Sequence, residues 1–335
     1  MKKKNHSKIL FTNRSGGLVT SGLFALLSIT AAFACADEQA SVKPRSVVLP
    51  DGNVRDQTPT PETVTEIGRQ SLKNMILFKA GSFEMGDWGE QVSASKLPFD
   101  GSADSKPVHQ VKLSSFSIGK FPVTYAEFDI FTASLGLPKI NQATAIQNYR
   151  KPNNPAGVTW QGATDYCKWL ADITGKPFAL PTEAQWEYAA RSGGQRHVYP
   201  TDNGKRELGR NLPDADQTKS AGGLTEVSDF PPNMAGIYYM GANVHEWVAD
   251  WYDPNYYASS PLQDPKGPAT GSKRVVRGNF GTGGTEMTFK RWSWDAENRM
   301  KPWKKRGTMP GEATREIPVT KYSASPENAF RCAQN

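Results

Sequence analysis

The stretch ALPTEAQWEYAAR, residues 179–191, carries the clearest structural signal in this 335-residue chain. Thr182 and Gln185 form a capping box, in which two side chains satisfy backbone groups at the start of a helix. The helix should end before the glycines at 193–194, because glycine accepts the backbone conformations that terminate helices. Trp186 within it is large and mostly apolar, so we expect this helix to pack in a core.

Three more helices have start signals upstream of this stretch. Thr124 and Glu127 form a second capping box. Thr159 precedes a segment whose apolar residues recur at helical spacing, with Gly175 just past its end. A shorter helix is expected from 61 to about 72, where a proline and a glutamate follow a threonine.

The strands are shorter than the helices and lie between loops. Residues 74–87, NMILFKAGSFEMGD, read as a β-hairpin with its turn at 80–81, and a further strand is expected within 108–124. After the glycine pair, the chain holds only short apolar runs among Gly, Pro, Asn and Asp. The sequence therefore predicts an α+β fold with little regular secondary structure, in one domain at 72–335 that follows a polar linker with a short helix at 37–71.

Residues 1–36 differ from the rest of the chain. Five basic residues precede the apolar run GLFALLSITAAFA, and no acidic residue occurs before Asp37. This layout is that of a secretory signal peptide, so we expect a periplasmic protein. Cleavage after Ala34 or Ala36 would release a soluble form, which we favour. Cleavage before Cys35 would leave a lipid-modified form attached to the inner or outer membrane, and this alternative stays open.

Without the signal, the charge of the chain is nearly balanced. The whole chain has 40 basic and 33 acidic residues. Five basic residues and no acidic ones lie in the signal, which leaves 35 against 33. Nucleic-acid binding is therefore not predicted, since it would require a basic surface on the folded part.

A glycine-dense turn follows a short β-like run in RVVRGNFGTGGTEMTFKRWSW, residues 274–294. Glycine lets the backbone approach a bound group where a side chain would collide. The stretch GTGG is not a phosphate-binding loop, because no Lys-Ser/Thr follows it and no helix pattern opens after it. No nucleotide site is predicted here.

The order of several segments resembles the formylglycine-generating enzyme family, also called sulfatase-modifying factor proteins. The segments that carry the resemblance are GSFEMGD (81–87), KPVHQV (106–111), FSIGKFPVTYAEF (116–128), PAGVTWQGATDYCKWL (155–170), ALPTEAQWEYAAR (179–191), FPPNMAGIYYMGANVHEWVADWYD (230–253), DPKGP (264–268), RVVRG (274–278) and AFRCA (329–333). LPTEAQWEYAAR and NVHEW are the most specific of them. The resemblance implies an α+β fold related to C-type lectin domains.

The chain has three cysteines, at 35, 167 and 332. If Cys35 is cut off or lipidated, an even pair remains in an oxidising compartment, which favours a disulfide. The family resemblance implies the same bridge, from Cys167 in the second long helix to Cys332 in the FRC ending. Two buried free thiols are the alternative.

The resemblance also shows what the glycine loop lacks. Catalytic members of the family carry two cysteines, five positions apart, after the RVxxG strand, and use them to bind copper(I), which soft sulfur ligands select. Gly283 and Thr288 stand at those positions. We therefore expect no copper and no copper-dependent formylglycine formation.

The loop is expected to line a groove that lacks the copper-binding cysteines of the catalytic members. The expected groove residues are Glu286, Arg291, Trp292 and Trp294, with Asp250 and with His245, which replaces the family's aromatic residue in NVxEW. A peptide could lie there through aromatic contact and charge pairing. The alternative is that the two tryptophans are core residues, one facing each side, and that Glu286 and Arg291 are solvated.

Calcium is the metal that the resemblance implies, bound through oxygen ligands. The matching positions are Asn211 and Leu212 for one site, with Asp214 or Asp216 in place of the aspartate expected near Lys219, and Ala242, Val244 and Glu246 for the other. Tyr239 stands where the second site should have asparagine. The alternative for Glu246 is a buried carboxylate paired with an arginine or with backbone donors.

Two functions stay open. The first is a non-catalytic envelope protein that binds a peptide or protein, as cysteine-less relatives do when they regulate type VI secretion through threonine phosphorylation. The second is a periplasmic maturation enzyme of the oxidoreductase type, like the relative that matures the pyoverdine chromophore. Glu286 or His245 would then serve as acid or base.

One further segment, residues 295–321, is longer than the family usually has. It is basic around Trp303. It could dock an acidic partner or anionic lipid heads, or it could be a solvated loop.

Overall fold

A computed structural model describes residues 58–142, 144–279, 283–296 and 320–335. The predicted signal, the lipidation site and most of the linker and basic insertion lie outside these ranges. The chain divides into the units Met1–Lys43 and Pro44–Asn335, and every described residue belongs to the second. None of the helices within the described ranges has the length and apolar character needed to span a bilayer.

The central sheet has the order β8-β7-β6-β9. Its strands are β6 (Val244–Trp251), β7 (Arg274–Asn279), β8 (Trp292–Trp294) and β9 (Asn328–Phe330). The pairs β6–β7 and β7–β8 are antiparallel, whereas β9 runs parallel to β6. Successive residues of a strand face opposite sides, so β6 contributes Trp247 to one hydrophobic core and Val248 to another.

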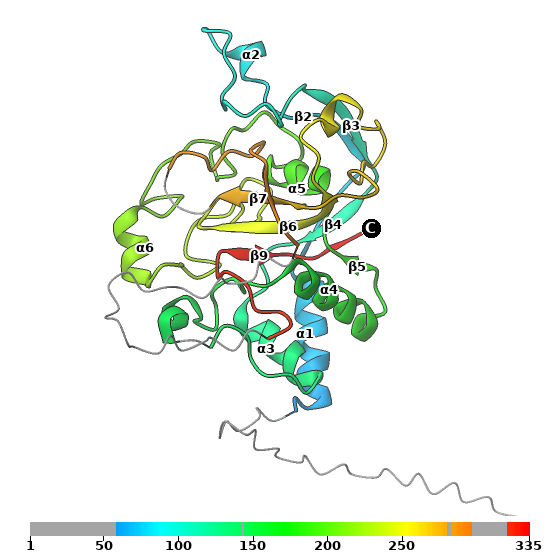
Figure 1. Ribbon diagram of the computed structural model, residues 1–335, viewed down its shortest axis with the longest axis vertical. Coiled ribbons are helices and arrows are strands. Elements are labelled where there is room, and N and C mark those ends of the chain that lie inside the picture. Colours follow the sequence, from blue (N-terminus) through cyan, green and yellow to red (C-terminus); the bar gives the residue numbers. More distant parts are fainter. Residues whose placement is uncertain (1–57, 143, 280–282, 297–319) are drawn as a thin grey trace, which may run out of the picture. The chain divides into compact units, whose positions relative to one another are not determined.

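Helices cover both faces of this sheet (Figure 1). The helices are α1 (Pro61–Lys73), α2 (Gly89–Val92), α3 (Tyr125–Ser134), α4 (Trp160–Thr174), α5 (Glu183–Ala190) and α6 (Ala215–Ala221), with 3-10 turns at Thr144–Tyr149 and Tyr256–Ala258. Phe128 of α3 and Tyr166 of α4 share the core of Trp247. Trp186 of α5 shares the core of Val248, and all eight residues of α5 are buried.

The predicted helix starts are confirmed. Both bonds of the capping box are present at Thr124 of α3 and at Thr182 of α5. The side chain of Thr159 caps α4, which ends at Gly175 in the left-handed conformation with φ 64°. Helix α6 was not predicted, although its cap at Asp214 has the same pattern.

The expected hairpin at 74–87 is wrong. Strand β1 (Met75–Phe78) pairs with β4 (Phe116–Gly119), and β2 (Gly81–Met85) pairs with β3 (His109–Leu113). The register is continuous across both pairs, so residues 75–85 form one bent strand along 109–119. The backbone N–H of Ala80 donates to Ser115 Oγ at 2.9 Å, which holds the bend where a turn was expected.

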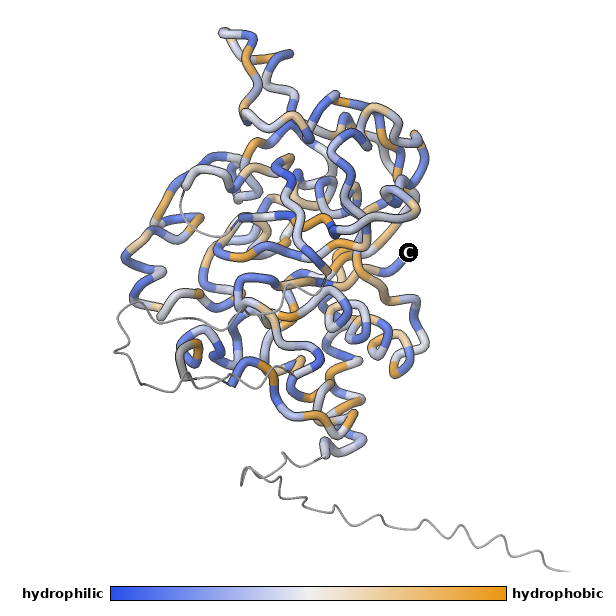
Figure 2. The backbone as a smooth tube through the Cα atoms, viewed as in Figure 1, coloured by the Kyte–Doolittle hydropathy of each residue, from blue (hydrophilic) through white to orange (hydrophobic). Residues whose placement is uncertain are grey.

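The C-terminus closes a second sheet, of order β1-β4-β10-β5. Strand β10 (Ala333–Gln334) lies between β4 and β5 (Phe178–Ala179). Figure 2 shows hydrophobic segments gathered beside the C-terminus, where β4 and β10 lie. The disulfide between Cys167 of α4 and Cys332 joins this end to the helical layer, with 5.7 Å between the Cα atoms, which confirms the predicted bridge.

Candidate functional site

His245 and the two tryptophans of β8 form an aromatic cluster on one face of the central sheet. The His245 ring centroid lies 5.4 Å from that of Trp292 and 5.6 Å from that of Trp294. The tryptophans share this face because they are two residues apart in one strand, so they do not face opposite sides, but both pack against the hydrophobic core of Trp247, as the alternative interpretation expected. The β7 residue in register with His245 is Gly278, which has no side chain to separate the rings.

The aromatic cluster holds polar atoms that have no partner. His245 Nδ1, Trp292 Nε1 and Trp294 Nε1 are buried and form no hydrogen bond in the described parts of the chain. The Nδ2 amide of Asn328, which is in register with His245 on β9, is also unpartnered. A buried polar group left without a partner costs about 1–3 kcal/mol. Such a concentration indicates a place that a ligand or water completes.

Burial determines the charge of His245. Its side chain is 6% exposed, and burial lowers the pKa of the imidazole to about 4, with a small opposing effect from the backbone at Gly278. His245 is therefore neutral at neutral pH, with one nitrogen able to donate and the other to accept a hydrogen bond.

The two positions of the lost cysteine pair lie in different surroundings. Gly283 is exposed, and a Cβ built on it would meet no atom within 4 Å. Thr288 is fully buried, where its Oγ1 donates to the carbonyl of His197 and its N–H donates to that of Val198, both at 2.8 Å. Neither residue can supply the thiolate that copper(I) requires.

Glu286 is a paired carboxylate outside the aromatic cluster. Arg206 Nε lies 3.0 Å from Glu286 Oε2, and Arg206 Nη2 lies 3.4 Å from Oε1. The side chain of Glu286 is only 2% exposed, so it is not the solvated residue of the alternative interpretation. Arg206, which is 80 residues away in the chain, was not predicted as its partner.

Arg291 and Asp250 lie on the other face of the sheet, against α5. Arg291 binds both oxygens of Glu183, at 2.7 and 3.1 Å. Asp250 Oδ2 accepts the backbone N–H of Glu183 at 2.8 Å. The structure therefore does not bring these two predicted groove residues to the aromatic cluster.

Glu183, Glu187, Arg191, Arg277 and Arg291 form a buried ionic network there. Arg277 bridges Glu183 and Glu187 with two contacts of 2.8 Å, and Arg191 contacts Glu187 at 3.0 Å. Burial alone would raise the pKa of Glu183, but Arg291 and Arg277 hold it below its usual value. Burial, and then the charge of Glu183, raise the pKa of Asp250 to about 8.

The second predicted calcium site is bonded within the chain. Arg331 binds both oxygens of Glu246, at 2.7 and 2.6 Å, and Trp186 Nε1 donates to one of them at 2.9 Å. The hydroxyl of Tyr239 donates to the carbonyl of Thr225. This arrangement supports the alternative for Glu246, a buried carboxylate paired with arginine. Ala242 and Val244 are buried beside it.

The first predicted calcium site is also bonded within the chain. Asn211 Oδ1 accepts the backbone N–H of Glu207, and the Leu212 carbonyl accepts that of Gly209. Asp216 lies in the first turn of α6, where no residue is buried. No group of three or more His, Cys, Asp or Glu in the described ranges could hold a metal ion. Calcium binding through the backbone carbonyls of these segments stays a prediction, and metal analysis of the dialysed protein is the direct test.

Comparison with known proteins identifies the class of protein that this fold and site define. Residues 60–309 match the model of the sulfatase-modifying factor enzyme 1-like domain. The chain therefore belongs to the family that contains the formylglycine-generating enzymes, as its motifs predicted. The formylglycine-generating enzyme of Streptomyces coelicolor is 32% identical, over 66% of this chain and 83% of its own length.

Two further relatives extend the comparison. The serine/threonine-protein kinase pkn1 of Chlamydia pneumoniae is 32% identical over 62% of this chain, but the match spans only 33% of the kinase. The structure of PvdO from Pseudomonas aeruginosa has a TM-score of 0.57 and 22% identity, and covers 78% of this chain and 94% of PvdO. At that identity, the likeness to PvdO confirms the α+β family fold and nothing more.

Proposed function

We propose that this chain is a formylglycine-generating-enzyme-like domain that binds a peptide or protein partner through the aromatic cluster of His245, Trp292 and Trp294. The observation that carries the proposal is the set of buried, unpartnered nitrogens there, of which the two indole groups and the Asn328 amide are N–H donors. A peptide backbone supplies carbonyl acceptors for such groups, and rigid aromatic rings give contact area at a low cost in conformational entropy.

The chemistry of the site favours binding over catalysis. General acid–base catalysis needs proton donors and acceptors within reach of the same substrate. Glu286 forms an ion pair with Arg206. Asp250 lies on the face of the central sheet that α5 covers, opposite to the face of His245. Neither of these two carboxylates is therefore available as a partner for His245.

The finer parts of the proposal rest on the sequence and on the relatives. The predicted signal peptide at residues 1–36 supports a periplasmic location, and lipidation of Cys35 would attach the domain to a membrane. Part of a serine/threonine-protein kinase is 32% identical to this chain, which supports a role beside phosphorylation signalling, such as regulation of type VI secretion.

A peptide array tests the proposal. Bound sequences are remade as fluorescent peptides, and their affinity is measured by polarisation for the wild type and for His245→Ala and Trp292→Ala. We expect each variant to lose affinity at least about tenfold, which corresponds to ~1.4 kcal/mol. Lys168→Ala, at an exposed position of α4, is the control and should bind as the wild type does.

Two results would overturn the proposal. One is peptide binding that neither variant changes. The other is a change in peptide mass that requires His245, because this would establish the maturation-enzyme alternative. Supplying copper with a cysteine peptide is a separate check, and we expect no aldehyde.

A further inference from the structure

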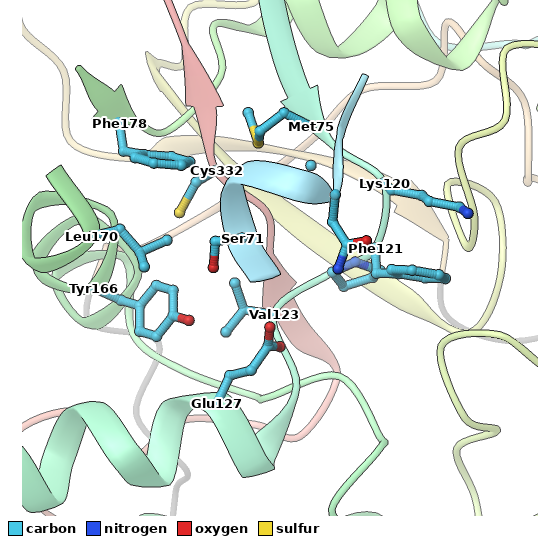
Figure 3. Close-up of a pocket in the computed structure, with 13 residues that line it drawn as sticks. Ser71, Met75, Lys120, Phe121, Val123, Glu127, Tyr166, Leu170, Phe178 and Cys332 are labelled. Carbon is cyan, nitrogen blue, oxygen red and sulfur yellow. The ribbon is translucent and has the colours of Figure 1, made fainter. Parts of the chain in front are cut away.

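A separate cavity lies among α1, α3, α4 and β4, and shares no residue with the aromatic cluster (Figure 3). Water-sized molecules can enter about 50 Å³ of it, within about 400 Å³ of empty space that includes its mouth. A buried water needs roughly 10–15 Å³ by this measure. The cavity thus has room for a small organic group of a few heavy atoms.

Three polar side chains converge in this cavity. Figure 3 shows the hydroxyls of Ser71 and Tyr166 and the carboxylate of Glu127 pointing toward one another. Tyr166 is fully buried, and its hydroxyl meets no partner with the distance and angle of a full hydrogen bond in the described parts of the chain, whereas the Ser71 side chain lies near enough to oppose the rise in the pKa of Tyr166. The charge of Glu127 raises the pKa of Tyr166 further, after the larger effect of burial, because the two groups lie close together.

Glu127 has one oxygen that is free to bind a ligand. Its Oε2 accepts both the N–H and the hydroxyl of Thr124, each at 2.8 Å, which completes the cap of α3. No Lys or Arg side chain of the described residues forms an ion pair with this carboxylate, and burial raises its pKa. The other capping boxes of this chain, at α5 and α6, use Gln185 and Gln217 in the same position. The cap therefore does not require an acid.

Lys120 is the charged base among the residues that line the described cavity, and its ammonium group contacts two aromatic rings. Lys120 Nζ lies 5.3 Å from the ring centroid of Phe121 and 5.2 Å from that of Tyr238. Figure 3 shows the Lys120 side chain extending away from Glu127. The Glu127 carboxylate can therefore form an ion pair with a cationic ligand that enters the cavity.

We propose that this cavity binds a primary ammonium group on a short apolar stem. An ammonium has three N–H donors and no acceptor, which matches the three oxygens of Glu127, Tyr166 and Ser71. The apolar side of the cavity, which includes Val123 and Leu170, accommodates the stem. A guanidinium presents five donors in a wide plane, and a quaternary ammonium presents none, so neither matches.

Calorimetry with n-propylamine tests the proposal on the purified chain. We expect saturable binding, with a Kd on the order of 1 mM because the ligand has few heavy atoms. Glu127→Gln should weaken binding at least about tenfold, since it removes the charge and keeps the cap. Tyr166→Phe keeps the ring in the core and should weaken binding several-fold. n-Butanol and tetramethylammonium are the matched ligands that we expect not to bind.

The source of the ammonium group is distinguished by a second ligand, N-acetyl-lysine methylamide. Binding of this ligand alone would assign the cavity to a lysine side chain of a protein partner. Binding of n-propylamine as well would assign it to a free small amine. The proposal is overturned if neither ligand saturates, or if the wild type, Glu127→Gln and Tyr166→Phe bind equally.

Peptide binding at the aromatic cluster should be unchanged in Glu127→Gln. The experiments therefore test the amine cavity and the peptide-binding aromatic cluster independently. Thermal melting of both variants verifies the fold, and Tyr166→Phe remains the informative variant if the cap of Glu127→Gln is weakened.

Discussion

The two faces of β6 hold their buried polar groups in different ways. On the face that α5 covers, arginine binds each of Glu183, Glu187 and Glu246 at 3.0 Å or less. On the face of His245, the imidazole and the indoles of Trp292 and Trp294 keep buried nitrogens without partners. The three carboxylates on one side of the strand thus each have an arginine partner, although Arg191 Nη2 and Arg277 Nε there are unpartnered, whereas each of the three rings on the other side has a nitrogen without a hydrogen-bond partner among the described residues.

This difference in hydrogen bonding distinguishes polar groups that stabilise the fold from polar groups that are available to bind a ligand. Breaking a buried ion pair leaves a charge uncompensated and costs about 3–5 kcal/mol. Removing a polar atom that has no partner costs little or stabilises, because no bond is lost. Stability and binding should therefore respond in opposite ways on the two faces.

Arg277→Ala should have the largest effect on stability. Arg277 is fully buried and contacts both Glu183 and Glu187. Its loss leaves two carboxylates short of a cation, and we expect the free energy of unfolding to fall by about 3–5 kcal/mol in urea denaturation. Lys168→Ala, which breaks an exposed pair on α4, should cost less than about 0.5 kcal/mol. If both variants lost the same free energy of unfolding, the buried ionic network would contribute no more to stability than an exposed ion pair.

Cys167→Ser should have the next largest effect. The bridge to Cys332 spans 165 positions of the sequence and restricts the unfolded chain. Removing a native disulfide costs about 2–5 kcal/mol, so the melting temperature should fall and the mobility on a non-reducing gel should change. An unchanged melting temperature and mobility would show that the bridge does not form.

Asp250→Asn should change the pH dependence of stability. The pKa of Asp250 is raised to about 8 in the folded protein, against about 3.9 for a free aspartate. Its contribution to stability is therefore present at acid pH and is lost as the pH rises from about 4 through about 8. We expect the melting temperature of the wild type to decline over this range more than that of Asp250→Asn. Parallel profiles would mean that the carboxyl is ionised in the folded state.

Trp294→Phe should have the smallest effect on stability and a clear effect on binding. The substitution removes an unpartnered N–H and keeps an aromatic ring, so the free energy of unfolding should change by less than about 1 kcal/mol. Affinity for peptides selected on the array should fall several-fold. A large loss of stability together with unchanged affinity would assign Trp294 to the core.

The helix starts and the disulfide could be predicted, whereas strand partners could not. A capping box involves residues within four positions of one another, so the sequence displays it directly at Thr124 and Thr182. The pairing of residues 75–85 with 109–119 depends on contacts across a long loop, and local turn residues suggested a hairpin in its place.

The candidate site was predicted in part for the same reason. Trp292, Trp294 and His245 were named from their motifs, and the rings do meet. Arg291 is adjacent to Trp292 in sequence but points to the opposite face, toward Glu183, because neighbouring residues of a strand alternate. Asn328 joins the site only through the parallel pairing of β9 with β6, which no sequence pattern signals.

The position of β10 has a consequence for biogenesis. This strand is inserted between β4 and β5, and β9 flanks β6, so the short segment from residue 328 to residue 334 completes two sheets. Premature termination before residue 328 would leave both sheets with open edges, which are sites of aggregation and proteolysis. Closure of the two sheets is therefore coupled through residues 328–334, and a truncation that removes this segment should expose both sheets at once.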